Sequence, residues 1–585
     1  TYLLAYLRAK GDKEEQEAAE GIQEAVGDLP GVTLGGEALA NQQVNEQVSH
    51  DIERAELFAL PLIFLLSLLF FRGVVAAALP PLLGGLAIVL TFAGLRAASE
   101  LGSVSIFAVN LVTALGLGLA IDYSLFMVSR YREELARVGP GGEAIRNTLA
   151  TAGRTVLFSG LTVAAALSSL LVFPQRFLYS MGLGGVMVAL IAVGVALIVL
   201  PALLAVLGER VNALAPKRLQ RAARKDARPA SNGFWYRLSR VVMRRPGRIA
   251  LASAVALVVL GLPFLDIRFV VADAEVLPGE ASARQVDDAL AERFDSNATE
   301  PVRLVVEAPL GAELEPLVRQ VRGLQGVAGV SRPERLRSDT TLLNVTSRDD
   351  PLSTRGQDVV REIRALDTPL PLLVSGTSAS FADLKASLLD HLPVALAIVV
   401  MATLVLLFLM TGSVVLPIKA LVMNVLTLSA TFGILVLVFQ DGRLEGLLGY
   451  ESQGALEITQ PIVLFAVAFG LATDYGVFLL SRIKEARDAG VPDSEAVAVG
   501  LERTGRIVTA AALLFTVAVG ALATSDIIFI KQLGVGTALA VLIDATVVRA
   551  LLVPSLMELL GRRNWWAPRP LRRLHERVGL REAPT

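Results

Sequence analysis

"GLGLAIDYSLFMVSRYREE", residues 116–134, places an aspartate and a tyrosine inside an apolar run long enough to lie in a bilayer. "AFGLATDYGVFLLSR", residues 468–482, repeats the pattern, so the Asp-Tyr dipeptide at 122–123 is matched at 474–475. Each aspartate stands eight residues before an arginine that begins a charged stretch, which is about 12 Å along a helix. A carboxylate at that depth must be protonated, paired or hydrated, so both are predicted to face the interior of a helical bundle.

The duplication extends beyond this motif. "TAGRTVLFSGLTVAAAL" in the first half corresponds to "RTGRIVTAAALLFTVAVGAL" in the second, and "LPALLAVLGER" corresponds to "VPSLMELLGRR". Eleven apolar runs, each near the roughly 20 residues that span a bilayer, fall at 57–71, 74–95, 104–129, 155–173, 178–207, 249–265, 392–411, 414–438, 459–481, 507–524 and 532–560. We predict two tandem, non-inverted repeats of six spans with eleven present, the first span being missing upstream of residue 1.

Composition supports a multi-pass α-helical membrane protein. Of the 585 residues 54% are hydrophobic and only 19% are charged, and the mean hydropathy is +0.59, which no ordinary soluble domain shows. The chain has no cysteine and three scattered histidines, so we expect no disulfide, no metal site and no cysteine nucleophile. No Gly-Lys dipeptide occurs, which excludes a phosphate-binding loop and leaves an ATP-driven pump unsupported. We therefore expect no catalytic residues and no cofactor, and neither an enzyme nor a nucleic-acid-binding protein.

Lysine and arginine collect on every second connection, the pattern of cytoplasmic loops. The predicted segments are 1–54 (the C-terminal part of a first extracytoplasmic domain), 55–207 (five spans), 208–248 (a basic cytoplasmic linker), 249–266 (the span opening the second repeat), 267–391 (a second extracytoplasmic domain), 392–560 (five spans) and 561–585 (a basic cytoplasmic tail).

The second outer segment has a β-α-β-β-α-β pattern, which indicates a ferredoxin-like α+β domain. Its predicted strands are 302–308, 326–331, 340–347 and 371–376, and its predicted helices are 313–323 and 354–366. In the first half only the end of such a unit is predicted, with a strand at 1–9, a helix at 12–27 and a strand at 31–36.

The duplicated Asp-Tyr pairs are candidates for a proton relay. Adjacent helix positions point about 100° apart, so a pseudo-two-fold axis between the repeats lets Asp122 reach Tyr475 while Asp474 reaches Tyr123. A tyrosine hydroxyl can donate to a carboxylate or accept from a carboxylic acid, which suits a site whose protonation changes. The alternative is a purely structural role, in which two interhelical hydrogen bonds only stabilise the packing of the helices.

The last apolar run adds Asp544 and Arg549, which the first repeat lacks. Residues five apart lie about 140° apart on an α-helix, so we expect each to find its partner on another helix, the nearest candidate being the span of Asp474. The alternative for Arg549 is that it snorkels to the cytoplasmic interface. Four small residues near the pairs, Gly116, Gly118, Gly470 and Gly476, are predicted to allow close helix packing.

The two Asp-Tyr stretches, with "GVGTALAVLIDATVVRALLVPSLMELLGRRNWW", resemble the MMPL (mycobacterial membrane protein large) transporters of the resistance-nodulation-division (RND) superfamily, in particular actinobacterial members. The resemblance covers essentially the whole chain. It implies that Asp122, Tyr123, Asp474, Tyr475, Asp544 and Arg549 form the proton relay, and that the outer ferredoxin-like domains form a porter region that takes substrate from the outer leaflet.

The resemblance implies a secondary active transporter in the bacterial inner membrane that exports lipids or other hydrophobic compounds, driven by the proton-motive force. Its partners would be protons, the bilayer and a lipid or hydrophobic small molecule, with an accessory protein or an oligomer left open. A multidrug efflux pump of the same superfamily is a second interpretation. A third is a proton-driven membrane assembly factor or sensor, which would act on a protein.

Overall fold

Eleven helical segments are long and apolar enough to cross a membrane, among the residues that the computed structural model describes. These residues are 12–27, 29–100, 102, 104–214, 233–271, 274–293 and 300–578. The segments are α2 (Glu37–Phe71), α3 (Val74–Ser99), α4 (Phe107–Val138), Gly142–Val172, Arg176–Asn212, Pro246–Asp266, α16 (Thr377–Thr411), Val415–Gln440, α19 (Gln460–Asp488), Asp493–Thr524 and Ile528–Trp565. The predicted class, a polytopic helical membrane protein with eleven spans, is confirmed.

Six of these segments contain short turns of π- or 3-10 helix. Their parts are α5 (Gly142–Thr148), η1 (Leu149–Gly153), α6 (Arg154–Ser168) and η2 (Ser169–Val172); α7 (Arg176–Gly194), η3 (Val195–Val199), α8 (Leu200–Leu207) and η4 (Gly208–Asn212); α11 (Pro246–Gly261) and η6 (Leu262–Asp266); α17 (Val415–Leu435) and η9 (Val436–Gln440); α20 (Asp493–Gly520) and η10 (Ala521–Thr524); and α21 (Ile528–Ile543), η11 (Asp544–Leu552), α22 (Val553–Leu560) and η12 (Gly561–Trp565). The basic segments add α10 (Phe234–Arg244) and α23 (Arg569–Val578).

The chain divides into a membrane unit, Val48–Arg268 with Pro393–Thr585, and an α+β unit, Thr1–Gln47 with Phe269–Leu392. The sequence-based boundaries at 54/55 and 391/392 fall inside the continuous helices α2 and α16. The domain limits drawn from the sequence therefore differ from the structural units by several residues at 54/55 and by one residue at 391/392.

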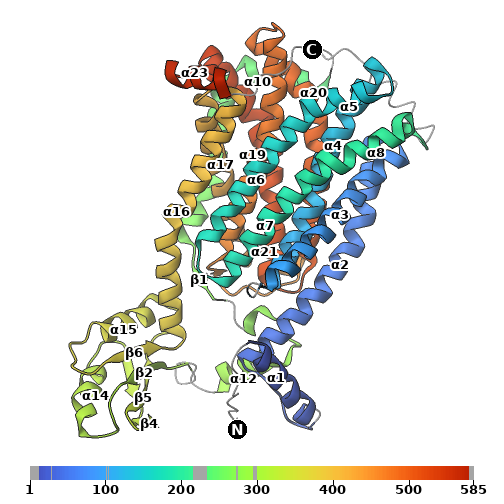
Figure 1. Cartoon of the computed structure of the whole chain (residues 1–585). Coiled ribbons are helices and arrows are strands. Elements are labelled where there is room, and N and C mark those ends of the chain that lie inside the picture. Colours follow the sequence, from blue (N-terminus) through green and yellow to red (C-terminus); the bar gives the residue numbers. More distant parts are fainter. Residues whose placement is uncertain are drawn as a thin grey trace. The chain divides into compact units, whose positions relative to one another are not determined.

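Helices α4 and α19 form the centre of the membrane unit (Figure 1). In their most apolar windows 94% of α4 and 83% of α19 is buried, against 22% of α11 and of α16. Helix α4 packs against α3, α7 and α20, and α19 packs against α6, α20 and α21. Each central helix therefore contacts helices of the other repeat, and the polar groups in its middle are shielded from lipid.

Close contacts surround three of the four glycines singled out from the sequence. A Cβ atom at Gly118 would lie 2.4 Å from Cε2 of Phe515, and one at Gly116 would lie 2.8 Å from Cγ1 of Ile88. At Gly470 the nearest atoms would be 3.3 Å away, whereas at Gly476 nothing lies within 4 Å. The geometry leaves no room for a side chain at Gly116 or Gly118 and does not restrict Gly476 in this way.

Alanine at Gly118 is expected to destabilise the protein by about 1–3 kcal/mol, because the buried Phe515 ring must shift to admit the methyl group. Alanine at Gly476 is the matched control, since space is open there and alanine has the better helix propensity. Thermal unfolding of the purified variants in one detergent compares the two. Equal melting temperatures for the two variants would contradict the packing role of Gly118.

The α+β unit contains the β-α-β-β-α-β order read from the sequence. Its elements are β2 (Val302–Val306), α14 (Glu315–Arg322), β3 (Val327–Val330), β5 (Thr340–Ser347), α15 (Thr354–Arg364) and β6 (Leu372–Ser375). The antiparallel sheet has the order β3-β5-β2-β6, with Leu304 opposite Leu343 on one side and Val374 on the other. Alternate residues of β5 are buried, as the two-residue period of a strand requires, and they include Thr341 and Ser347 as well as Leu343 and Val345. The predicted strands and helices of this segment are confirmed.

Two details of the α+β unit differ from the sequence interpretation. A short strand, β4 (Glu334–Arg337), also pairs with β5 and was not predicted, because its four residues are all exposed and carry no alternation. Helix α1 (Asp12–Val26) is present as predicted, but residues 32–35 form no strand. Gly35 packs instead against Val286 of α12 (Ser282–Arg293). The strand predicted at 1–9 lies outside the described residues.

Candidate functional site

The two repeats meet through polar side chains at the middle of α4 and α19. The Tyr475 hydroxyl donates a hydrogen bond to Oδ2 of Asp122, and the two oxygen atoms are 2.6 Å apart. Both residues are buried: Asp122 is 0% exposed and Tyr475 is 1% exposed. The bond joins residues 353 positions apart in the chain, and it is the contact between repeats that the matched Asp-Tyr spacing led us to expect.

The second pairing is open in this structure. The Tyr123 hydroxyl and both carboxylate oxygens of Asp474 are buried and make no hydrogen bond of normal geometry among the described residues, although the two side chains interact. Duplicated sequence has thus produced two unequal halves, one closed by a hydrogen bond and one not. A carboxylic acid has a smaller desolvation cost than a carboxylate, so burial favours a bound proton at either aspartate.

Asp544 and Arg549 form an ion pair with each other, contrary to the expectation from the helical wheel. Nη2 of Arg549 lies 2.5 Å from Oδ2 of Asp544, and Nε donates to the same oxygen at 2.6 Å. Both residues lie in η11, a stretch of π-helix. Because π-helical hydrogen bonds link residues five apart, this geometry brings the two side chains onto one face.

Arg549 also contacts the central helix α19. Its Nη2 donates to the carbonyl oxygen of Ala472 at 2.6 Å, and its guanidinium carbon lies 5.3 Å from the centre of the Tyr475 ring. The arginine is 4% exposed, so the alternative that it snorkels to the membrane surface is wrong. Asp544, Arg549, Tyr475 and Asp122 therefore form one continuous series of contacts across both repeats.

An aromatic pair lies one helical turn beyond the aspartates. Phe126 follows Asp122 by four residues, and Phe478 follows Asp474 by the same interval. Their rings are stacked, with centroids 3.5 Å apart and planes 6° from parallel. The two repeats are thus in direct contact both at the carboxylates and between the carboxylates and the basic ends of α4 and α19.

Comparison with known proteins identifies the family. A family model described as MMPL family matches residues 1–249 and 338–581. The chain belongs to the MMPL family. The membership inferred from the Asp-Tyr motifs is confirmed, and with it the assignment to a multi-pass membrane protein.

Three relatives of this MMPL protein share its sequence over most of its length. A putative membrane protein of Streptomyces coelicolor is 41% identical over 567 residues, covering 95% of this chain and 76% of the relative. The trehalose monomycolate exporter MmpL3 of Mycolicibacterium smegmatis is 36% identical over 591 residues, covering 94% of this chain and 58% of the exporter. The mycolic acid-containing lipids exporter MmpL11 of the same organism is 32% identical over 561 residues, covering 91% and 57%. The chain thus spans less than two thirds of either named exporter.

The MMPL site includes polar residues that were not singled out from the sequence. Asn424 of α17 donates to Thr473 of α19 at 2.9 Å, beside the central aspartate. Lys419 is 8% exposed, and its Nζ lies 3.3 Å from Oδ1 of Asn564. A cavity of about 30 Å³, room for about one water molecule, is lined by Lys419, Asn424, Thr473, Asp544 and Arg549, among others. The sequence could have pointed to Lys419, because it is the one charged residue in the apolar run 414–438.

The described residues contain no group of three or more His, Asp or Glu side chains placed to hold a metal ion. Every candidate site residue named from the sequence lies in the membrane unit. The site therefore consists of two buried Asp-Tyr pairs and one buried ion pair. Chemically, such an arrangement can take up, hold and release protons.

Proposed function

We propose that this MMPL protein is a secondary active transporter that exports a lipid or other amphiphile, driven by the proton gradient across the bacterial plasma membrane. The observation that carries the proposal is the buried series Asp122–Tyr475–Arg549–Asp544, which joins the repeats at the centre of the membrane unit. The relatives named as exporters of trehalose monomycolate and of mycolic acid-containing lipids support a lipid cargo. A transporter, not an enzyme, is the activity that this combination favours.

The unequal halves of the site indicate how a proton would couple the repeats. Asp122 accepts a hydrogen bond from Tyr475, whereas Asp474 interacts with Tyr123 without a hydrogen bond of normal geometry. A proton on Asp474 would remove a buried charge and supply a donor, which permits a new contact to Tyr123. Loading and release of that proton would shift the balance between the two pairings. Movement of α4 against α19 is the resulting conformational change.

The orientation follows from the charges. Lysine and arginine are concentrated on the 130–154 loop, the 208–248 linker and the 561–585 tail, and this bias is characteristic of the cytoplasmic face. The α+β unit is then extracytoplasmic and belongs to the region that receives cargo from the outer leaflet. Periplasmic or external proteolysis of intact cells tests this placement, since cleavage within 300–391 is expected from outside only.

Tyr475→Phe is expected to lower proton-driven transport about tenfold, because the Asp122 carboxylate loses a hydrogen bond and remains buried. Tyr123→Phe is the matched variant in the other repeat and is expected to have a smaller effect on stability, since the Tyr123 hydroxyl makes no hydrogen bond of normal geometry among the described residues. Transport in proteoliposomes and thermal unfolding are measured on both. Identical losses of stability would contradict the inequality of the two halves.

Lipid analysis of cells distinguishes the lipid exporter from its alternatives. A strain that lacks the protein should accumulate a lipid species on the cytoplasmic side, and the wild-type gene should reverse this. A drug-efflux pump would change drug susceptibility with no such accumulation, and an assembly factor or sensor would cause secretion or signalling defects instead. Absence of any lipid change in the deletion strain would overturn the proposed cargo class.

A further inference from the structure

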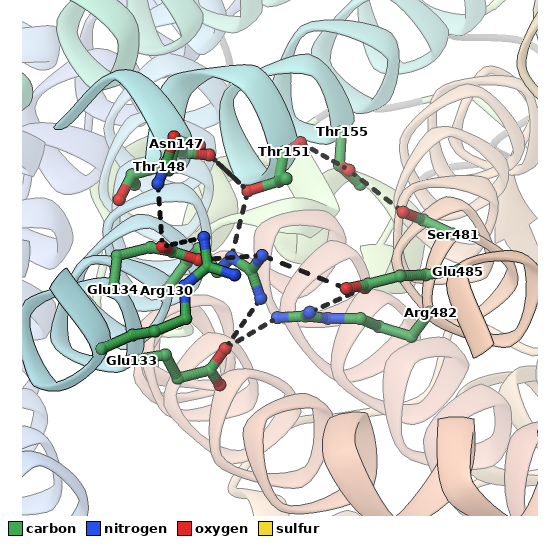
Figure 2. Close-up of polar contacts among 11 residues, drawn as sticks. Arg130, Glu133, Glu134, Asn147, Thr148, Thr151, Thr155, Ser481, Arg482 and Glu485 are labelled. Carbon is green, nitrogen blue, oxygen red and sulfur yellow. Dashed lines mark hydrogen bonds and ion pairs between the residues drawn. The ribbon is translucent and has the colours of Figure 1, made fainter. Parts of the chain in front are cut away.

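Four charged side chains form a ring between the basic ends of α4 and α19 (Figure 2). The ring consists of Arg130 and Glu133 from α4 with Arg482 and Glu485 from α19. Within each helix the arginine pairs with the glutamate three residues on, at 3.1 Å in α4 and 2.9 Å in α19. Between the helices, Arg482 Nη2 lies 3.4 Å from Glu133 Oε2, and Arg130 Nη2 lies 4.0 Å from Glu485 Oε1.

The charge ring repeats the symmetry of the Asp-Tyr pairs on the same two helices. Its arginines follow Asp122 and Asp474 by eight residues, and its glutamates follow them by eleven. Eight residues correspond to about 12 Å along a helix, and the stacked Phe126 and Phe478 rings lie within that interval. A movement that separates α4 from α19 at the ring therefore also changes the distance between the two halves of the carboxyl site.

The two sides of the ring are anchored differently. Arg130 also pairs with buried Glu134 at 3.0 Å, and its Nε donates to Thr151. Glu134 in turn accepts from Arg137 and Asn147 of its own repeat. The position that corresponds to Glu134 in the second repeat is Ala486. Buried Glu134 thus ties Arg130 to its own repeat. The α19 side has no such carboxylate, and its links to its own repeat include those of Lys484 to the Met410 carbonyl oxygen and of Arg487 to Asp493.

At this end α19 has few polar side-chain contacts with the first repeat, although it packs against α6. Besides the ring, Ser481 and Thr155 of α6 share a hydrogen bond of 3.3 Å, and within the second repeat Arg503 of α20 also acts on Glu485. The side chains of Glu133 and Glu485 are 50% and 32% exposed. Partly exposed ion pairs add little net stability. Opening this ring therefore has a small free-energy cost, whereas separating the buried pair of Asp544 and Arg549 has a large one.

We propose that the charge ring is the inner gate of the proton route. Closed, it holds α19 against α4 and separates the carboxyl site from the cytoplasm; open, it admits water to Asp122 and Asp474 so that a proton can leave. Opening separates Arg482 and Glu485 from the α4 side, which buried Glu134 ties to the first repeat. This inference rests on the proposed proton-coupled transport, and it identifies the place where the proton leaves to the cytoplasm.

Cross-linking tests the gate, because the chain contains no cysteine. Glu133→Cys and Arg482→Cys are combined and bridged with a short bifunctional thiol reagent, since an Arg–Glu contact spans more than a disulfide can. The reagent is a bis-methanethiosulfonate, which joins the two cysteines through mixed disulfides that a thiol reductant cleaves. We expect the bridge to abolish proton flux and cargo transport in proteoliposomes, and reduction to restore both. Arg482→Cys with Glu485→Cys is the matched control: it also removes two ring charges, but its bridge stays within α19, so the flux of this variant should be the same before and after bridging.

The outcomes separate the gate from the proposed function. Equal transport before and after bridging of the 133–482 pair overturns the gate. Absence of gradient-driven transport in the unmodified protein overturns the proposed function instead. If the double cysteine variant does not fold, Glu133→Gln is used: it should raise proton leak in the absence of cargo, whereas exposed Glu143→Gln should not. A Glu133→Gln protein as proton-tight as the wild type overturns the gate as well.

Discussion

Asparagine at Asp474 or at Asp122 is expected to abolish proton-driven transport while leaving the protein folded and inserted in the membrane. Asparagine has nearly the shape of aspartate but cannot take up a proton at neutral pH. Both side chains are fully buried, and a charged side chain at membrane depth costs at least about 2.5–3.5 kcal/mol. Removing the charge should therefore keep or raise the melting temperature. Transport is measured in proteoliposomes with an imposed pH gradient, and stability by thermal unfolding.

Asp488→Asn is the control for the Asp474 variant. Asp488 lies on the same helix α19 but is exposed, so its neutralisation should affect neither transport nor stability. Full gradient-driven transport by both buried variants would leave the carboxyl pairs with a packing role only. Loss of transport together with loss of folding would point to the same conclusion, because replacing a relay residue is expected to abolish transport without lowering the melting temperature.

The matched spacing of the two Asp-Tyr stretches was sufficient to predict that the repeats meet there. Because the aspartates are equally far from the next arginine in both copies, a pseudo-two-fold arrangement brings Asp122 opposite Tyr475 without further information. The α+β strands were predictable from short runs rich in β-branched and apolar residues, such as "TTLLNVTS", although the run does not show which of its side chains are buried. Repetition and composition are properties of the sequence itself.

Other features depend on backbone geometry that the spacing of residues in the sequence does not show. The ion pair of Asp544 with Arg549 exists because η11 is π-helical, whereas a wheel of 3.6 residues per turn separates the two. The unequal pairing of Asp474 and Asp122 also cannot be read from two identical dipeptides. Residues 32–35 form no strand, although they read as one, since a short apolar run alone does not determine whether a strand forms.

Replacing Arg549 by methionine is expected to destabilise the protein by about 3–5 kcal/mol and to abolish transport, since Asp544 would be left as a buried, uncompensated charge. The double variant Asp544→Asn with Arg549→Met removes both charges and should recover most of the lost stability. It should not recover transport, because the cation beside Tyr475 is still missing. Thermal unfolding and gradient-driven transport are measured on the single and double variants.

Arg562→Met is the control for that experiment, because this arginine is exposed at the end of the last span and its loss should cost little. The double variant decides between two roles of the ion pair. A pair that only stabilises η11 can be replaced by neutral groups with function intact, so recovery of stability and transport together would show that Asp544 and Arg549 lie outside the relay. Recovery of stability alone is the result expected if Arg549 sets the charge at Tyr475, since that charge has no substitute among the neutral side chains introduced.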